Sequence, residues 1–149
     1  MPTLEETLHE YFKWDRIAEG FGIEVVDFGN GNARTRMTVR DMHLNGLDIV
    51  HGATVFALAD FTFAVASNSH GTVAVAIHTD LSFVKAVKSG TLYADAKETS
   101  ISPKLSTYDI LVTDDTGATV GIFHGMAYRK KDLIADIVAA RQRGPAGSD

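Results

Sequence analysis

The stretch from Gly52 to Ser69 reads GATVFALADFTFAVASNS and decides the fold of this 149-residue chain. Its apolar side chains occupy every side of a helix instead of one stripe, which is typical of a helix that is buried all round. With 18 residues and a rise of 1.5 Å per residue, such a helix is roughly 27 Å long, the diameter of a small domain. We therefore expect one long central helix with the rest of the chain packed around it.

Segments with the period of a strand lie on both sides of this helix. They are expected at residues 23–28, 33–40, 73–83, 91–99, 106–113 and 118–129, with turns at 29–32 and 114–117. Short helices are expected at residues 3–14 and 132–143, where apolar side chains recur at helical spacing. This order predicts an α+β fold in which one antiparallel sheet wraps around the long central helix.

The length suits one domain. We expect it to cover residues 1–143, followed by a disordered tail at 144–149, where glycine and proline are frequent. Strands and helices do not alternate as in a βαβ nucleotide-binding fold, and the sequence has no glycine-rich phosphate loop.

Composition excludes several classes of protein. The chain is 45% hydrophobic and 22% charged, which is typical of an ordered globular domain. It has no cysteine, so a disulfide scaffold, a thiolate nucleophile and a Cys-ligated zinc are excluded, and a reducing compartment such as the cytoplasm is expected. The net charge of −5 argues against a nucleic-acid partner. No apolar run reaches the ~20 residues that span a bilayer, and no signal peptide is visible, so no membrane partner is expected.

Asp60 is the acidic side chain of the central segment, and its neighbours are Ala59 and Phe61. Burying a carboxylate is costly unless it is paired or hydrogen-bonded. The structural interpretation is that Asp60 faces a polar seam or caps a neighbouring strand. In a helix that is apolar all round, a functional role is the better hypothesis.

The segment before the helix also carries polar candidates. Gly52 opens the helix, and the first N–H groups of a helix have no intrahelical acceptor and lie at the positive end of its dipole. Such donors could hold the oxygen of a polarised carbonyl, as acyl transfer requires. Each residue also has a structural interpretation, because Gly52 permits a tight entry into the helix, His51 can be a structural side chain and Asn45 a turn residue.

The spacing of Gly52 and Asp60 bears on assembly. Eight residues separate them, which is ~12 Å along a helix. For both to act on one carbonyl, each must lie about 3 Å from the reacting group. Two antiparallel helices from two subunits could achieve this, so if both residues are catalytic the sequence predicts a homodimer with two equivalent sites at its interface.

The motifs in and around the helix resemble those of a known family. The matching positions are Asn45-Gly46, His51-Gly52-Ala53, Phe56-Ala57-Leu58-Ala59-Asp60, Phe63-Ala64, Ala66, Asn68, Gly71, Gly90-Thr91-Leu92, Tyr108-Asp109-Ile110 and Phe123-His124-Gly125-Met126-Ala127-Tyr128-Arg129. Over roughly residues 8–130 they are similar to the signature of hotdog-fold acyl-CoA thioesterases, most of all the phenylacetate-pathway (PaaI-type) branch. The resemblance implies the hotdog fold, hydrolysis of aryl- or medium acyl-CoA to free acid and CoA, no cofactor or metal, and a homodimer that pairs into a dimer of dimers.

The resemblance also implies a role for each site residue. Asp60 would activate water or attack the thioester directly, and the Gly52 amide would polarise the thioester carbonyl. Asn45 would orient the nucleophile or the substrate, and His51 would brace the loop. Asp60 would come from the subunit opposite Gly52.

Two positions depart from the family pattern. Ala53 stands where the family usually has a second glycine, which implies a tighter acyl pocket. Lys85-Ala86 stands where the family usually has Arg-Pro, and lysine lacks the planar fork that suits a phosphate. Because the chain is acidic, binding CoA would need local positive charge. The candidates are Lys85, Lys88, Lys104, Arg129, Lys130 and Lys131.

Two other functions fit the same residues. A hotdog-fold dehydratase acting on 3-hydroxyacyl thioesters would use a histidine and a carboxylate at one carbon, for which His51 and Asp60 are the candidates. A non-catalytic acyl-CoA binding module would bind the ester without turnover. Release of free thiol from acyl-CoA distinguishes hydrolysis from both. A metal site is not expected, because His78 and Asp80 alone do not make one.

Overall fold

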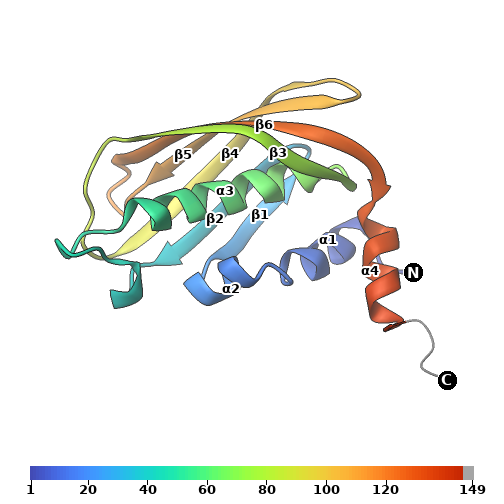
Figure 1. Ribbon diagram of the computed structural model, residues 1–149, viewed down its shortest axis with the longest axis horizontal. Coiled ribbons are helices and arrows are strands. Elements are labelled where there is room, and N and C mark those ends of the chain that lie inside the picture. The colour runs from blue at the N-terminus through green and yellow to red at the C-terminus, as the bar shows by residue number, and fades with distance from the viewer. Residues whose placement is uncertain (146–149) are drawn as a thin grey trace.

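The long central helix, α3 (Gly52–Asn68), lies across the concave face of an antiparallel sheet in the computed structural model (Figure 1), which describes residues 1–145. The six strands are β1 (Glu24–Gly29), β2 (Asn32–Thr38), β3 (Thr72–Phe83), β4 (Thr91–Ile101), β5 (Leu105–Thr113) and β6 (Thr119–Leu133). Their order in the sheet is β1-β2-β4-β5-β6-β3. The predicted α+β architecture is confirmed, whereas the tail expected at 144–149 lies, from residue 146 onward, outside the described residues.

The alternation of β2 explains how the sheet faces the core. Ala33, Thr35 and Met37 are buried against α3, and the arginines between them point outward. The Arg34 guanidinium contacts the Asp95 carboxylate on β4 at 3.1 Å, which pairs the two strands on the outer face. The alternation of side chains therefore turns one side of β2 to the core and the other to solvent.

Two faces of α3 have different surroundings. Leu58, Ala59 and Val65 are fully buried against the sheet. An outer stripe retains exposure, and its members are Ala53, Phe56, Ala57, Asp60 and Ala64. The expectation that α3 is buried all round is thus met only in part within one chain, because the sheet covers one side of it and the N-terminal segment only some of the other.

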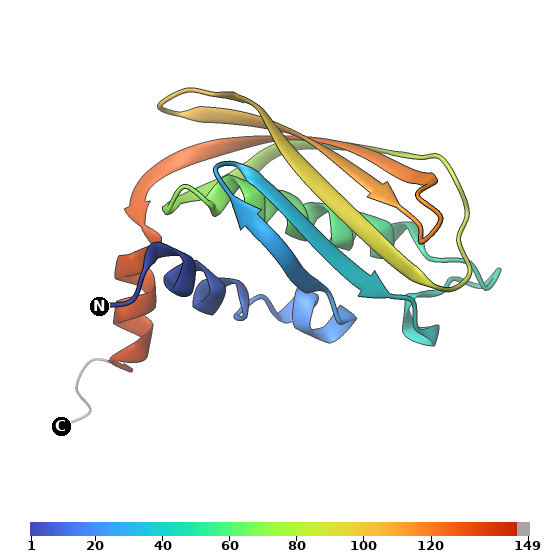
Figure 2. The same cartoon turned by 180° about the vertical axis from the view of Figure 1, so that it is seen from behind.

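The remaining helices lie on the open side of the sheet. They are α1 (Leu4–Phe12), α2 (Arg16–Phe21) and α4 (Ile134–Gln142), and Figure 2 shows α4 beside α1 at one end of the molecule. The sequence did not predict α2, which begins at an Asp15 cap and ends at Gly22 in the left-handed conformation. No helix within residues 1–145 has the length and apolar character needed to cross a membrane.

The edge strand β3 exposes apolar side chains. Val75, Ile77 and Phe83 are 45%, 55% and 62% exposed. The strand pairs with β6 along one side, and its register shifts between Ala76 and His78. Because β3 ends the sheet, its other backbone edge is unpaired within the described chain.

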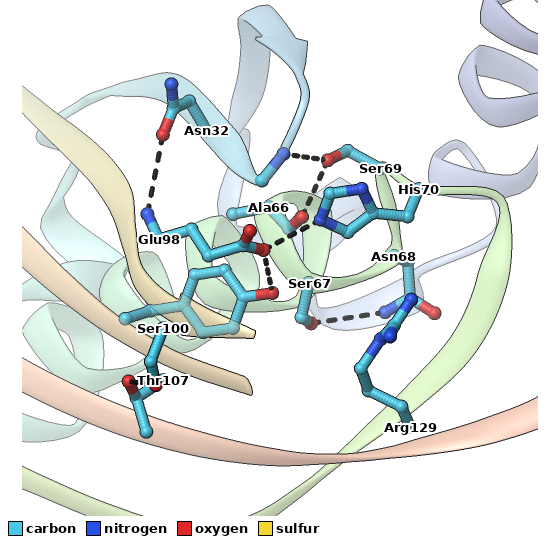
Figure 3. A network of polar contacts seen from close by, with 12 residues as sticks. Asn32, Ala66, Ser67, Asn68, Ser69, His70, Glu98, Ser100, Thr107 and Arg129 are labelled. Carbon is cyan, nitrogen blue, oxygen red and sulfur yellow. Dashed lines mark hydrogen bonds and ion pairs between the residues drawn. The ribbon is translucent and has the colours of Figure 1, made fainter. Parts of the chain in front are cut away.

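A polar network fixes the C-terminal end of α3 to the sheet (Figure 3). The Glu98 carboxylate accepts a hydrogen bond from the Tyr108 hydroxyl at 2.7 Å and contacts His70 Nε2 at 2.7 Å. The Ser69 hydroxyl accepts from the Gly31 amide at 2.8 Å. Burial raises the pKa of Tyr108, so its hydroxyl stays a donor. These bonds set the position of α3, and hence of Asp60, relative to the strands.

Candidate active site

His43 anchors the loop that leads into α3. It ends the short 3₁₀ helix η1 (Asp41–His43) and is fully buried. Its ring bonds the Arg40 amide and the Phe21 carbonyl, each at 2.9 Å. Its carbonyl accepts from the His51 amide at 2.8 Å and from the Thr54 hydroxyl at 3.1 Å. Burial lowers the pKa of His43, which keeps its ring neutral. Sequence reasoning missed this residue, because a histidine in a polar segment forms no distinctive pattern.

Asn45 organises the loop and keeps one group free. Its Oδ1 accepts from the Leu47 amide at 2.9 Å and from the Ile49 amide at 3.3 Å. Asp48 has a φ of 57°, the left-handed conformation that closes this turn. The Asn45 side-chain NH₂ bonds no acceptor within residues 1–145. It is therefore a donor available to a ligand.

The start of α3 holds a second free donor. His51 is the N-cap, and its Nδ1 accepts from the Ala53 amide at 2.9 Å. The Thr54 amide bonds the His51 carbonyl at 2.9 Å. The Gly52 amide has no acceptor in the described part of the chain. Gly52 thus presents an N–H at the positive end of a 17-residue helix, the arrangement that stabilises negative charge on an oxygen.

Three of the residues expected from the sequence line one hollow. Asn45, Gly52 and Lys85 border a space of about 310 Å³ that Phe83 and other apolar side chains complete. A Cβ atom at position 52 would lie 3.2 Å from the Phe83 ring, so glycine permits the close approach. The hollow therefore combines a free backbone donor, a free amide donor and a cation.

The cation in the hollow is not free. The Lys85 ammonium forms a short ion pair with Asp114 at the start of the β5–β6 turn. The ammonium, together with the Thr116 hydroxyl, holds the pKa of Asp114 well below its usual range. Lys85 would therefore have to exchange this partner to contact a phosphate.

Asp60 lies two turns further along α3, on the outer stripe. It is half-buried, and its carboxylate has no hydrogen-bond or ion-pair partner among residues 1–145. Burial raises the pKa of Asp60, and the nearby Asp15 carboxylate adds to the effect. Asp60 does not line the Gly52 hollow of its own chain. A half-buried acid with a raised pKa and no partner is typical of a functional carboxyl group.

The structure separates two other expected residues from this hollow. Lys104 lies in the β4–β5 hairpin, where its carbonyl accepts from the Arg129 amide at 2.7 Å. The whole of β5, nine residues and about 30 Å at 3.3 Å per residue, separates that hairpin from Asp114. The Ala53 side chain is exposed on the same stripe as Asp60. One chain does not bring Lys104 to the site.

Comparison with known proteins identifies the family. Residues 47–120 match the model of the thioesterase superfamily. A putative esterase of Archaeoglobus fulgidus is 35% identical over 126 residues, which are 83% of this chain and 82% of that protein. The acyl-coenzyme A thioesterase PaaI of Escherichia coli K12 is 34% identical over 125 residues, 83% of this chain and 89% of that protein. This chain belongs to the thioesterase superfamily.

The fold of this thioesterase agrees with that assignment. The solved structure of the E. coli PaaI protein from the phenylacetic acid degradation operon superposes with a TM-score of 0.83 and 31% identity. The superposition covers 87% of this thioesterase and 95% of that chain. The architecture is therefore the hotdog fold, and the protein is a thioester hydrolase. The resemblance noted in the sequence is confirmed.

Proposed function

We propose that this thioesterase hydrolyses aryl- or medium acyl-CoA thioesters to the free acid and CoA, with Gly52 and Asp60 as the groups that act on the thioester. The observation that carries the proposal is that α3 presents both a backbone N–H without an acceptor and a half-buried carboxylate with a raised pKa. A donor for the carbonyl oxygen and a base or nucleophile are the two parts that acyl transfer to water requires. The likeness to the acyl-coenzyme A thioesterase PaaI supports the choice of CoA esters.

Each of these residues has its own role in the reaction. The thioester carbonyl oxygen accepts from the Gly52 amide, where the helix dipole favours the negative charge that develops. Asp60 takes a proton from a water molecule as the water oxygen bonds to the carbonyl carbon. The tetrahedral intermediate then expels the CoA sulfur, the C–S bond breaks, and the proton passes from Asp60 to that sulfur. In the alternative course the Asp60 carboxylate itself attacks, and water hydrolyses the resulting anhydride. The free NH₂ of Asn45 orients the substrate or the nucleophile.

The site is composite in this proposal. Gly52 and Asp60 lie eight residues apart on one helix, which is ~12 Å, so the Asp60 that meets a given Gly52 belongs to a second copy. The half-exposed stripe of α3 and the exposed apolar side chains of the β3 edge support a homodimer, because a second copy would cover both. Pairing of two such dimers and a cytoplasmic location remain predictions.

Lysine side chains are the proposed contacts for the phosphates of CoA. Lys85 borders the hollow and is the better candidate for a phosphate contact, although Asp114 competes for its ammonium. Lys104 could contribute only to a site formed with another subunit. Ala53, exposed beside the helix start, would contact the acyl group from the dimer partner's side.

A thiol-release assay tests the proposal. The wild-type protein should release CoA from phenylacetyl-CoA or hexanoyl-CoA, and Asp60→Asn should lower kcat by about 10²-fold or more, because the amide can neither accept the proton nor attack. Asp132→Asn, the same exchange at an exposed position near the end of β6, is the matched control and should retain activity. Near-normal turnover by a folded Asp60→Asn protein would refute the assignment, and substrate dehydration without thiol release would favour the dehydratase.

A further inference from the structure

A second hollow lies along the part of α3 that follows Asp60, on the side away from Gly52. Its volume is about 300 Å³, and it opens between α3, α1 and the segment after it, β3 and α4. Figure 1 shows these elements meeting at the end of α3 that is nearest to both described chain ends. The residues that line it include Tyr11, Phe12, Trp14, Phe61, Ala64 and Arg141.

The hollow is continuous with the face of α3 that carries Asp60. Ala64 and Asn68 line it and follow Asp60 by four and eight residues, so they lie on the same face of the helix. Asp15 also lines it and is close enough to Asp60 to raise the pKa of that carboxyl group. A substrate whose carbonyl lies at Asp60 can therefore extend its acyl group along this face.

Four aromatic side chains line the hollow, together with Asp15, Asn68 and Arg141. Phe12 and Phe61 are buried and form the floor, and the rings of Tyr11 and Trp14 meet edge to face at 6.2 Å. The Arg141 guanidinium from α4 stacks on the Trp14 ring at 4.1 Å and has no carboxylate partner within residues 1–145. A cation over an indole face is stabilised by the ring quadrupole. The pair therefore forms one wall of the hollow, between α4 and the segment that follows α1.

The size of the hollow limits what can occupy it. A cavity of about 150 Å³ accommodates benzene, so a space of about 300 Å³ suits an aryl group on a short arm or a medium alkyl chain, and a long chain would have to displace the wall. The adjoining hollow of about 480 Å³ shares Asp15 with this one and lacks Trp14 and Arg141.

We infer that the aromatic hollow is the acyl pocket of this thioesterase and that Trp14 and Arg141 form the wall that sets the longest acyl group accepted. The inference rests on the proposed function for the identity of the ligand. Both wall residues lie outside residues 47–120, the part that matches the superfamily model. Selectivity thus comes from the N-terminal and C-terminal segments, while the segment from Asn45 to Asp60 supplies the chemistry.

Kinetic measurements on variants with a smaller side chain at Arg141 or Trp14 test this inference. The ratio of kcat/KM for dodecanoyl-CoA to that for hexanoyl-CoA is measured for the wild-type, Arg141→Ala and Lys13→Ala proteins. We expect the ratio to rise about 10-fold or more in Arg141→Ala, since pocket contacts of this size discriminate by such factors. It should be unchanged in Lys13→Ala, which borders the other hollow. Trp14→Leu provides a second opening of the wall. An unchanged ratio in both wall variants, or a rise in Lys13→Ala alone, would overturn the inference.

A binding measurement keeps the test independent of turnover. Trp14 is the one tryptophan of the chain, so its fluorescence reports on the wall alone. In the Asp60→Asn protein, saturation with hexanoyl-CoA or phenylacetyl-CoA should change the emission, and free CoA should not. A fluorescence change without thiol release by the wild-type protein would leave the pocket standing and refute the proposed hydrolysis. The same emission with and without bound acyl-CoA, with binding verified by calorimetry, would refute the pocket.

Discussion

Replacing Gly52 with proline removes the one atom that the proposed mechanism most needs from the backbone, the amide hydrogen. Gly52 is the first residue of α3, a position at which proline is favoured because the N–H there has no intrahelical acceptor. His51 has φ −62° and ψ 142°, the extended region that a residue before proline adopts. No hydrogen bond within residues 1–145 is lost with that N–H. We therefore expect the Gly52→Pro protein to fold.

The effect of the lost amide hydrogen on kcat is measured against Gly52→Ala, a control variant that keeps this hydrogen. Gly52→Ala adds a Cβ atom 3.2 Å from the Phe83 ring, as proline does, but retains the donor. The Phe83 side chain is mostly exposed and can turn away from either substituent. The two variants therefore differ chiefly in the N–H. Removing one donor to a developing oxyanion costs about 10²–10³ in kcat, or about 2.7–4 kcal/mol of transition-state stabilisation.

The assay is thiol release at saturating acyl-CoA, with thermal unfolding of both variants to verify the fold. We expect kcat of Gly52→Pro to be about 10²–10³-fold lower than that of Gly52→Ala, and the two variants to have similar melting temperatures. Equal turnover by the two variants would show that the Gly52 amide does not hold the carbonyl oxygen.

Three further changes have expected outcomes. Burial raises the pKa of Asp60 above its ordinary 3.8, so the unfolding free energy falls as the pH rises from 3.8 through the raised pKa. Asp60→Asn should therefore raise the Tm at pH 7, and this gain should vanish below pH 3.8. An equal gain in Tm at both pH values would contradict this cause. Tyr108→Phe removes the hydrogen bond to Glu98 and should lower the unfolding free energy by about 1–2 kcal/mol in urea denaturation. His51→Ala removes the acceptor for the Ala53 amide and should cost about 1 kcal/mol in the same measurement, and no loss would show that the cap is dispensable.

Local patterns predicted much of the fold. The position of α3 followed from a run of apolar side chains, and the β5–β6 turn from the segment ending at Gly117, whose φ is 84°. The six-residue helix α2 was missed because its stability comes from an Asp15 cap and a left-handed Gly22, without an apolar period. That β3 lies at the edge, with Ile77 exposed, depends on strand pairing between distant segments, which alternation does not encode.

In the site, too, contacts within one segment could be predicted from the sequence, and contacts between distant segments could not. Asn45 and Gly52 lie seven residues apart and meet in one hollow because a single loop holds them. The ion pair of Lys85 with Asp114 joins segments 29 residues apart and could not be read from the chain. The stacking of Arg141 on Trp14 joins the two ends of the fold, so this wall of the hollow became visible only in three dimensions.

In the proposed site Gly52 of one subunit works with Asp60 of the other, and heterodimers of two inactive variants test this pairing. In a heterodimer of Asp60→Asn with Gly52→Pro, one of the two interface sites combines the intact Gly52 of the first chain with the intact Asp60 of the second, and the other site lacks both groups. Differently tagged chains, co-expressed and purified through both tags, give this species free of homodimers. We expect the heterodimer to show about half of the wild-type turnover per dimer, while each variant homodimer is nearly inactive. Heterodimers that fold and bind acyl-CoA but remain as inactive as the parent homodimers would contradict it.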